Sequence, residues 1–173
     1  GAKTAAGLFA KVAVEEGKFS QGSPEYGPER TGAPIQAYTR ISDSEIRIHS
    51  AIDNPDVVVV LDATLLDTVN VCDGIADGGI VMVNTKDDPD KVRPKLRGAG
   101  VRVMTVDATQ ISLDEIRAPF PNAPMMGALV KATGAITLQT LFADVEKKFK
   151  RKGQAIVDGN IRALKRAYDE VRG

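Results

Sequence analysis

Residues 55–62 read PDVVVVLD, and this stretch decides the fold class. Its apolar residues run without a break from Val57 to Leu61, whereas a strand with one solvent-exposed face would alternate apolar and polar positions. An unbroken run of β-branched residues is typical of a parallel strand that is covered on both faces. We therefore expect Val57–Leu61 to be a buried central strand of a parallel sheet.

The segments that follow this strand alternate between strand-like and helix-like patterns. Further strands are expected at 79–84 and 101–106, and helices at 63–75, 88–97 and 112–118. Such alternation predicts an α/β layered sheet with right-handed crossovers. The C-terminal third carries no strand pattern, and its apolar spacing predicts helices at 124–133, 137–149 and 154–171.

The segments before the strand are less regular. Apolar residues at helical spacing predict a helix over 4–16 that ends at Gly17. The glycines and prolines in 19–31 predict a loop after it. Alternation at 35–41 and 46–48 predicts an antiparallel hairpin around residues 42–44. The whole pattern predicts one three-layer α/β/α domain over 1–173, with a mostly parallel, mixed sheet, one hairpin and a helical C-terminal third. Because a helix begins almost at residue 1, we expect a preceding strand and loop to be missing.

Composition limits the partners and the compartment. Lysine plus arginine and aspartate plus glutamate number 23 each, so the formal charge is zero and neither nucleic acid nor a membrane is expected as a partner. The single cysteine, Cys72, excludes an internal disulfide, and one thiolate cannot hold an iron–sulfur cluster. A chain with one cysteine and no apolar run of membrane length is expected to be soluble and cytoplasmic.

The segment PEYGPERTGAP at 24–34 is the first candidate site. Its prolines fix backbone angles and its glycines permit tight turns, so the loop is expected to be pre-shaped. It would then present charged and aromatic groups at fixed positions, either at an interface or near a substrate. An elaborate structural turn is the alternative. The candidate residues are Glu25, Tyr26, Gly27, Pro28, Glu29, Arg30, Thr31 and Gly32.

The start of the chain is the second candidate. Gly1, Ala2, Lys3 and Thr4 enter a helix where free backbone N–H groups and the helix dipole favour an anion. A phosphate-binding P-loop needs lysine directly after glycine, and here Ala2 intervenes. A plain helix N-terminus is therefore the alternative to an anion contact.

Several other polar residues have a structural interpretation. Asp62 and Asp107 end expected strands, so they either face the crevice beside the sheet or cap the next helix. His49 lacks a second histidine for a metal site, and Cys72 lies in an apolar run typical of an inert buried thiol. We expect 124–130 to be buried, and the basic run at 147–152 to be a solvated helix end.

Five segments together resemble one family. They are GAKTAAG (1–7), PEYGPERTGAP with IQAYTRIS after it (24–42), NPDVVVVLD (54–62), VNT (83–85) and PNAPMMGALVKATG (121–134). In this order they resemble the gamma subunit of the 2-oxoacid:ferredoxin oxidoreductases, across essentially the whole chain. The pyruvate enzymes of that family look closest. Members usually carry a strand and a GRGGQG-like turn upstream, of which only the last glycine survives here, as Gly1.

The resemblance implies a division of labour among subunits. Such enzymes oxidatively decarboxylate a 2-oxoacid on thiamine diphosphate and Mg²⁺ in the alpha and beta subunits. Electrons pass through 4Fe–4S clusters in beta and delta to ferredoxin, and coenzyme A takes the acyl group. The gamma subunit would bind none of these cofactors alone and would have no catalytic residue of its own. Its loop at 25–32 would shape the approach of substrate or coenzyme A, or contact neighbouring subunits.

Two other functions stay open at this point. The chain could serve an enzyme for branched-chain, aromatic or 2-oxoglutarate substrates, because the pocket for the substrate side chain would lie mostly in other subunits. It could also be a stand-alone nucleotide-dependent enzyme, with residues 1–7 as a remnant phosphate loop and Asp62 near a ribose.

Overall fold

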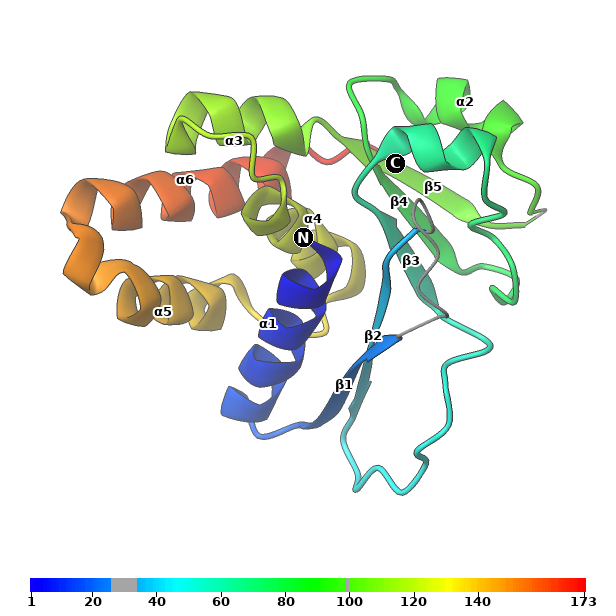
Figure 1. Cartoon of the computed structure of the whole chain (residues 1–173), viewed down its shortest axis with the longest axis horizontal. Coiled ribbons are helices and arrows are strands. Elements are labelled where there is room, and N and C mark those ends of the chain that lie inside the picture. Colours follow the sequence, from blue (N-terminus) through cyan, green and yellow to red (C-terminus); the bar gives the residue numbers. More distant parts are fainter. Residues whose placement is uncertain (26–33, 99) are drawn as a thin grey trace.

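The computed structural model describes residues 1–25, 34–98 and 100–173 (Figure 1). The strands are β1 (Phe19–Glu25), β2 (Gln36–Ser42), β3 (Val57–Val60), β4 (Ile80–Asn84) and β5 (Arg102–Val106). The α-helices are α1 (Ala2–Glu15), α2 (Pro89–Val92), α3 (Ala108–Ile116), α4 (Asn122–Thr133), α5 (Leu138–Phe149) and α6 (Gln154–Glu170). Short 3₁₀ turns are η1 (Ala63–Asp67), η2 (Arg93–Lys95) and η3 (Lys150–Lys152).

A parallel sheet with the strand order β3-β4-β5 forms the middle layer. The central strand is β4, whose first four residues are all buried. Side chains alternate across a strand, so Ile80 and Met82 face one side of the sheet while Val81 and Val83 face the other. The prediction of a parallel strand at 57–61 is confirmed, but its expected central position does not hold among the described strands. In the described sheet β3 is the outer strand and is only half-buried over most of its length.

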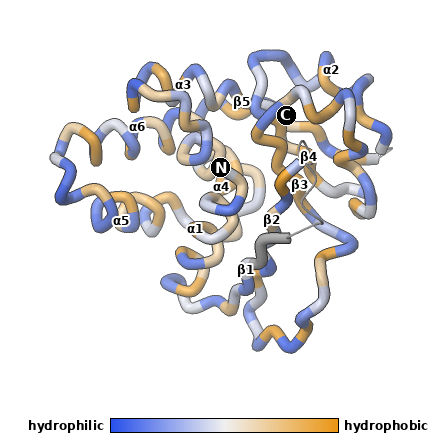
Figure 2. Tube along the Cα trace, in the orientation of Figure 1, coloured by the Kyte–Doolittle hydropathy of each residue, from blue (hydrophilic) through white to orange (hydrophobic). Residues whose placement is uncertain are grey.

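Helices cover the two faces of this sheet unequally (Figure 1). One face packs against α3, α4 and α6 through residues such as Ile111, Met125 and Ala163. The other face is covered by η1, α2 and the turns near them, through Leu66, Cys72 and other apolar side chains. Apolar residues of the strands and of α4 accordingly lie inside the molecule (Figure 2). The α/β class, with its parallel sheet, hairpin and helical C-terminal part, is confirmed.

The hairpin is made of different residues from those predicted. β1 pairs antiparallel with β2, from Phe19 opposite Ser42 to Glu25 opposite Gln36. The expected loop over 19–31 is therefore a strand up to Glu25, and 46–48 is not a strand. The guanidinium of Arg40 donates to the backbone oxygens of Ile48 and Ser50, so a side chain takes the place of a third strand.

The helix expected at 63–75 is also wrong. Only the η1 turn forms, and irregular turns follow it. The stretch is rich in threonine, valine, asparagine and aspartate, which are poor helix formers, and Gly74 adopts a left-handed φ of 74°. Its apolar residues still pack against the sheet. The hydrophobic pattern therefore indicated burial correctly, although the segment does not form a helix. At 88–97 the helix is shorter than expected, since α2 passes into η2.

The C-terminal helices and α1 form a second apolar cluster beside the sheet. Their positions match the predictions, and Gly17 ends α1 with a φ of 81° as expected. α4 lies in the middle of the helical part, and Met126, Leu141 and Leu164 pack together there. Two polar links tie α1 to the helices: Lys11 Nζ lies 2.6 Å from Asp144 Oδ1, and Glu16 accepts from the backbone N–H of Thr137 at the start of α5.

Candidate functional site

The carboxyl ends of the parallel strands meet at one edge of the sheet, where ligands of α/β proteins commonly bind. Asn84 at the end of β4 holds this edge together. Its Nδ2 donates to the backbone oxygen of Leu61 at 3.0 Å and to Oγ1 of Thr109 at 2.9 Å, and its Oδ1 accepts from the backbone N–H of Thr109. The end of β3 and the start of α3 are thereby fixed relative to β4. The sequence analysis did not predict this role of Asn84. The feature that could have indicated it is a polar residue directly after the apolar run IVMV.

Both aspartates at this edge act as helix caps. Asp62 accepts from the backbone N–H of Thr64 at 3.0 Å and from its hydroxyl at 2.7 Å. These two bonds lower the pKa of the Asp62 carboxyl, with the hydroxyl bond as the larger cause. Asp107 accepts from the backbone N–H of Gln110 in the first turn of α3. Of the two roles that the sequence allowed, the structure favours the capping role for both side chains.

The N-terminus of α1 lies against the same edge (Figure 1). A Cβ added to Gly1 would lie 3.2 Å from Oδ1 of Asn122, the first residue of α4, and 3.5 Å from Cδ1 of Leu61. Gly1 is the N-cap of α1 and has no side chain that could cap the helix. The first turn of α1 holds no acidic residue. The N-terminal ends of α1 and α4 thus meet at the carboxyl edge of β3, and Lys3 and Thr4 are exposed there.

The β1–β2 hairpin runs toward this same end of α1. Ser20 Oγ donates to the backbone oxygen of Ala10, and Thr39, which pairs with Gly22, donates to that of Ala6. The hairpin therefore advances along α1 toward its N-terminus as β1 proceeds. Three further residues of strand, at roughly 3.4 Å each, bring its end to the level of the first turn of α1.

This path brings Glu25, the first residue of one sequence candidate, toward the other candidate at residues 1–4. Glu25 is the last residue of β1, so the connection from β1 to β2 starts there. The remaining candidates, Tyr26, Gly27, Pro28, Glu29, Arg30, Thr31 and Gly32, lie outside the described residues. Gly1, Ala2, Lys3 and Thr4 lie at the sheet edge that the hairpin approaches. What the structure brings together is thus the anchor of the loop and the N-terminus of α1.

The remaining predictions concern structural residues. His49 is exposed, with Nδ1 3.3 Å from Nε2 of Gln21, and Cys72 is a buried free thiol. The surface position of His49 and the burial of Cys72 are as expected. Residues 124–130 are almost entirely buried in α4, as expected, and the basic run at 147–152 is exposed at the end of α5 except for half-buried Phe149.

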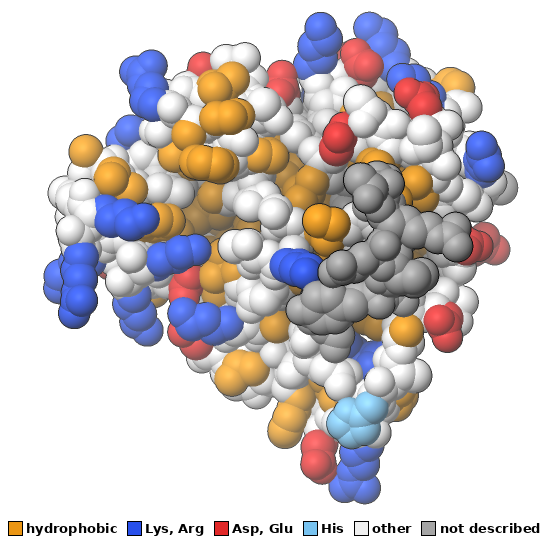
Figure 3. Space-filling model, in the orientation of Figure 1, with side chains coloured by type: hydrophobic (Ala, Val, Ile, Leu, Met, Phe, Trp, Pro, Cys, Tyr) orange, Lys and Arg blue, Asp and Glu red, His pale blue; other side chains and the backbone are white. Residues whose placement is uncertain are grey.

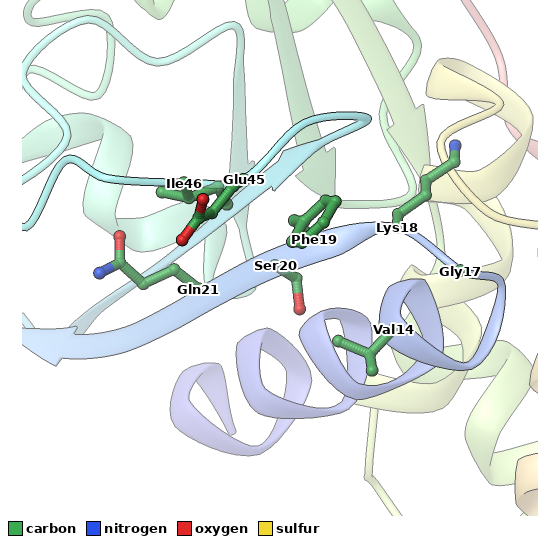
Figure 4. A pocket seen from close by; sticks show the side chains of 8 residues that line it. All are labelled: Val14, Gly17, Lys18, Phe19, Ser20, Gln21, Glu45 and Ile46. Carbon is green, nitrogen blue, oxygen red and sulfur yellow. The ribbon is translucent and has the colours of Figure 1, made fainter.

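A shallow hollow of about 440 Å³ lies at the opposite end of α1 (Figure 4). It is bounded by the C-terminal end of α1, the start of β1 and the segment after β2, and Val14, Phe19 and Ile46 give it an apolar lining. Its one carboxylate, Glu45, is paired with Arg47. Such a lining offers contact area and no group arranged for acid–base chemistry.

The part of the chain that the structure describes contains neither a metal-binding cluster nor a membrane-spanning helix. Within residues 1–25, 34–98 and 100–173, no three His, Cys, Asp or Glu side chains gather in a way that could hold a metal ion. Across those same ranges, every helix is too short or too polar to traverse a lipid bilayer.

Comparison with known proteins defines the class. Residues 1–170 match the family described as pyruvate ferredoxin/flavodoxin oxidoreductase, and the chain belongs to this family. It is 48% identical over 173 residues to pyruvate synthase subunit PorC of Thermotoga maritima, covering 99% of this chain and 89% of the relative. It is 43% identical over 171 residues to the pyruvate/ketoisovalerate oxidoreductases common subunit gamma of Thermococcus kodakarensis, covering 99% and 91%.

Solved structures agree with these relatives. The crystal structure of the pyruvate oxidoreductase subunit PORC from Thermotoga maritima superposes with a TM-score of 0.87 at 45% identity, covering 99% of this chain and 90% of that one. A 2-oxoglutarate:ferredoxin oxidoreductase from Magnetococcus marinus gives a TM-score of 0.76 at 17% identity, over 96% of this chain and 28% of that much longer one. The second likeness shows that the same fold also occurs as one part of a larger polypeptide.

Proposed function

We propose that this chain is the gamma subunit of a pyruvate:ferredoxin oxidoreductase. The whole enzyme would convert pyruvate, coenzyme A and two oxidised ferredoxins into acetyl-CoA, CO₂, one proton and two reduced ferredoxins. The observation that carries the proposal is the 48% identity to a pyruvate synthase subunit over almost the entire chain. At that identity and coverage, a shared place in the same kind of complex is the simplest inference.

The chain would contribute no redox group to this reaction. A 4Fe–4S cluster requires four protein ligands, typically cysteine thiolates, and the full sequence contains only Cys72. The resemblance to the family implies that thiamine diphosphate, Mg²⁺ and the clusters belong to the alpha, beta and delta subunits. The polar residues at the sheet edge bond to backbone groups of this chain, which fits a subunit that supplies shape and contacts.

We assign the working surface to the end of the molecule where the hairpin meets α1. The loop that starts at Glu25 and the first turn of α1 would together border the path of coenzyme A or contact the partner subunits. In this proposal Arg30 donates a bidentate hydrogen bond to a carboxylate or phosphate, and Glu25 or Glu29 binds a partner cation. Tyr26 supplies apolar area with a polar tip. Backbone N–H groups of residues 1–4 attract an anion, and the N-terminal dipole of α1 adds to this attraction.

The test uses the complete four-subunit complex carrying Arg30→Ala. A lost hydrogen bond to a charged group costs about 1.5–3 kcal/mol, so kcat/KM for coenzyme A should fall about tenfold to a hundredfold. The control is Arg97→Ala, which removes an exposed arginine near η2, on the other side of the sheet. Wild-type kinetics for Arg30→Ala in an intact complex would remove this role from Arg30. Wild-type complex that shows no pyruvate-dependent acceptor reduction would remove the proposed function itself.

A second candidate substrate is favoured by one observation. The Thermococcus kodakarensis relative is named as a subunit common to pyruvate and ketoisovalerate oxidoreductases. A gamma subunit that serves two enzymes cannot contain the pocket that measures the substrate side chain. The present chain could therefore serve a branched-chain 2-oxoacid enzyme as well. Purification of the native chain with all its partners, followed by kinetics with pyruvate and with 2-ketoisovalerate, distinguishes one role from two.

A further inference from the structure

The connection between α5 and α6 carries a concentrated positive charge. Five exposed cations lie within six residues, over the end of α5 and the η3 turn, and we call them the basic tip: Lys147, Lys148, Lys150, Arg151 and Lys152. The nearest carboxylates along the chain are Glu146 and Asp158, and Asp158 accepts a hydrogen bond from Gln154. Lys and Arg side chains gather at this end of the molecule, at the left edge of Figure 3.

The tip differs from the cationic residues farther along α6. Arg162 pairs with Glu115, Lys165 with Asp169, and Arg166 with Glu170. Among the described residues, by contrast, none of the five tip cations takes part in an ion pair. A solvated helix end does not require five cations, since one or two already complement the dipole at the C-terminus of α5. The excess of positive charge is therefore available to a partner that carries negative charge.

The surface chemistry of the tip favours a brief electrostatic encounter over a permanent subunit contact. Permanent interfaces are large and apolar, and lysine is depleted from their cores. Here the apolar groups are Ile156, which is 41% exposed, and Phe149, whose ring lies 5.4 Å from Lys148 Nζ and 5.5 Å from Lys152 Nζ. A rim of cations around a small apolar centre fits a partner with an acidic face that binds quickly and leaves quickly.

We propose that the basic tip guides an acidic ferredoxin to the assembled enzyme. The inference rests on the proposed function, because the family is described by its ferredoxin or flavodoxin partner and a carrier must arrive and depart in every catalytic cycle. The tip lies where α5 and α6 join, far from the parallel sheet (Figure 1), so it acts on the encounter with ferredoxin and not on the proposed working surface at the N-terminus of α1. Its effect is on the rate of association and is strongly salt-dependent.

The experiment compares two variants of the complete complex. In the first, Lys147→Gln, Lys150→Gln, Arg151→Gln and Lys152→Gln remove four of the five positive charges of the tip and leave Lys148, which lies against the Phe149 ring. In the matched control, Lys91→Gln, Lys95→Gln, Arg97→Gln and Arg102→Gln remove the same charge from exposed residues near α2, η2 and β5. Pyruvate oxidation is followed with a purified acidic two-cluster ferredoxin and, separately, with methyl viologen, a small acceptor without an acidic docking face.

We expect the tip variant alone to lose about tenfold in kcat/KM for ferredoxin at low ionic strength. The loss should disappear near 1 M salt, where the Debye length is about 3 Å, and the methyl viologen rate should stay at the wild-type value. An equal loss in both variants, or none in either, would overturn the proposal. Release of this chain from the complex would also overturn it, because the tip would then be a subunit contact. If wild-type complex reduces neither acceptor with pyruvate, the proposed function fails instead.

Discussion

Replacement of Gly127 by alanine tests how closely α4 and α6 approach each other. A Cβ added to Gly127 would lie 2.1 Å from the backbone oxygen of Leu164 and 2.8 Å from its carbonyl carbon. An ordinary contact begins at 3.4 Å, so one helix must retreat by about 1.3 Å, the difference between 3.4 Å and 2.1 Å. Backbone atoms cannot rotate away as a side chain can, and the surrounding interior is close-packed.

The expected magnitude follows from two opposing terms. Alanine in place of glycine inside a helix gains about 1 kcal/mol, whereas overpacking a core costs about 1–3 kcal/mol and more where backbone must move. We expect a net loss of about 2 kcal/mol or more in the free energy of unfolding, measured by urea denaturation and circular dichroism. The control is Gly7→Ala in α1, where a Cβ meets nothing within 4 Å and stability should rise by up to about 1 kcal/mol. If Gly127→Ala were as stabilising as Gly7→Ala, the close approach of the two helices would be refuted.

Three further changes have distinct expected outcomes. Lys11→Met should destabilise the chain by about 2 kcal/mol or more in urea unfolding, because Asp144, 2% exposed, then stays buried without its partner. Asp144→Asn should cost less, since the 59% exposed Lys11 side chain can turn to water, and equal losses would contradict this asymmetry. Burial tends to raise the pKa of Glu16, but hydrogen bonds at the start of α5 outweigh burial and lower this pKa from 4.5. The stabilisation from Glu16 is therefore complete above its unfolded pKa, near 4.5, and is lost as the pH falls toward the folded value. In Glu16→Gln the unfolding free energy should change less between pH 5 and pH 3, and an unchanged acid profile would exclude this contribution. Asn84→Ala should cost about 1–3 kcal/mol by leaving backbone groups of two elements unpaired, with faster amide exchange at the N-terminus of α3, and exchange at the wild-type rate would argue against its linking role.

The parallel sheet could be predicted from sequence because its signals are local. Val57–Leu61, 79–84 and 101–106 are apolar runs of strand length, and a parallel sheet buries both faces of such strands. The order of the strands was not available in the same way. A run of valines shows that a segment is covered, but only its pairing with β4 shows that β3 is an outer strand of the described sheet.

The hairpin was assigned to the wrong residues because its stability comes from distant contacts. β1 contains Gly22 and Pro24, which weaken a strand pattern, although proline is tolerated in an edge strand. Hydroxyl groups of both strands bond to backbone oxygens of α1, and no local pattern encodes those bonds. Conversely, residues 46–48 alternate like a strand, yet Arg40 binds the backbone oxygen of Ile48 from a side chain.

The candidate site could likewise be predicted only as separate segments, because their relative position depends on tertiary packing. The sequence indicated which segments carry unusual chemistry, namely the proline-glycine loop and the first turn of α1. Only the packing of the hairpin along α1 shows that Glu25, where the loop starts, approaches the end of α1 that lies next to the carboxyl edge of the sheet.

Charge shows most clearly what composition leaves out. A formal charge of zero predicted no long-range field that would attract nucleic acid or an anionic membrane. In the folded chain the cations of α6 are neutralised by carboxylates of α3 and of α6 itself, while the basic tip is left without such pairs among the described residues. The field near a surface depends on which charges are paired and where, and exposed charges act within about 10 Å at moderate salt. A chain that is neutral as a whole can therefore bind an acidic protein at one end, and the salt dependence of its reaction with ferredoxin is the property in which this segregation should first be seen.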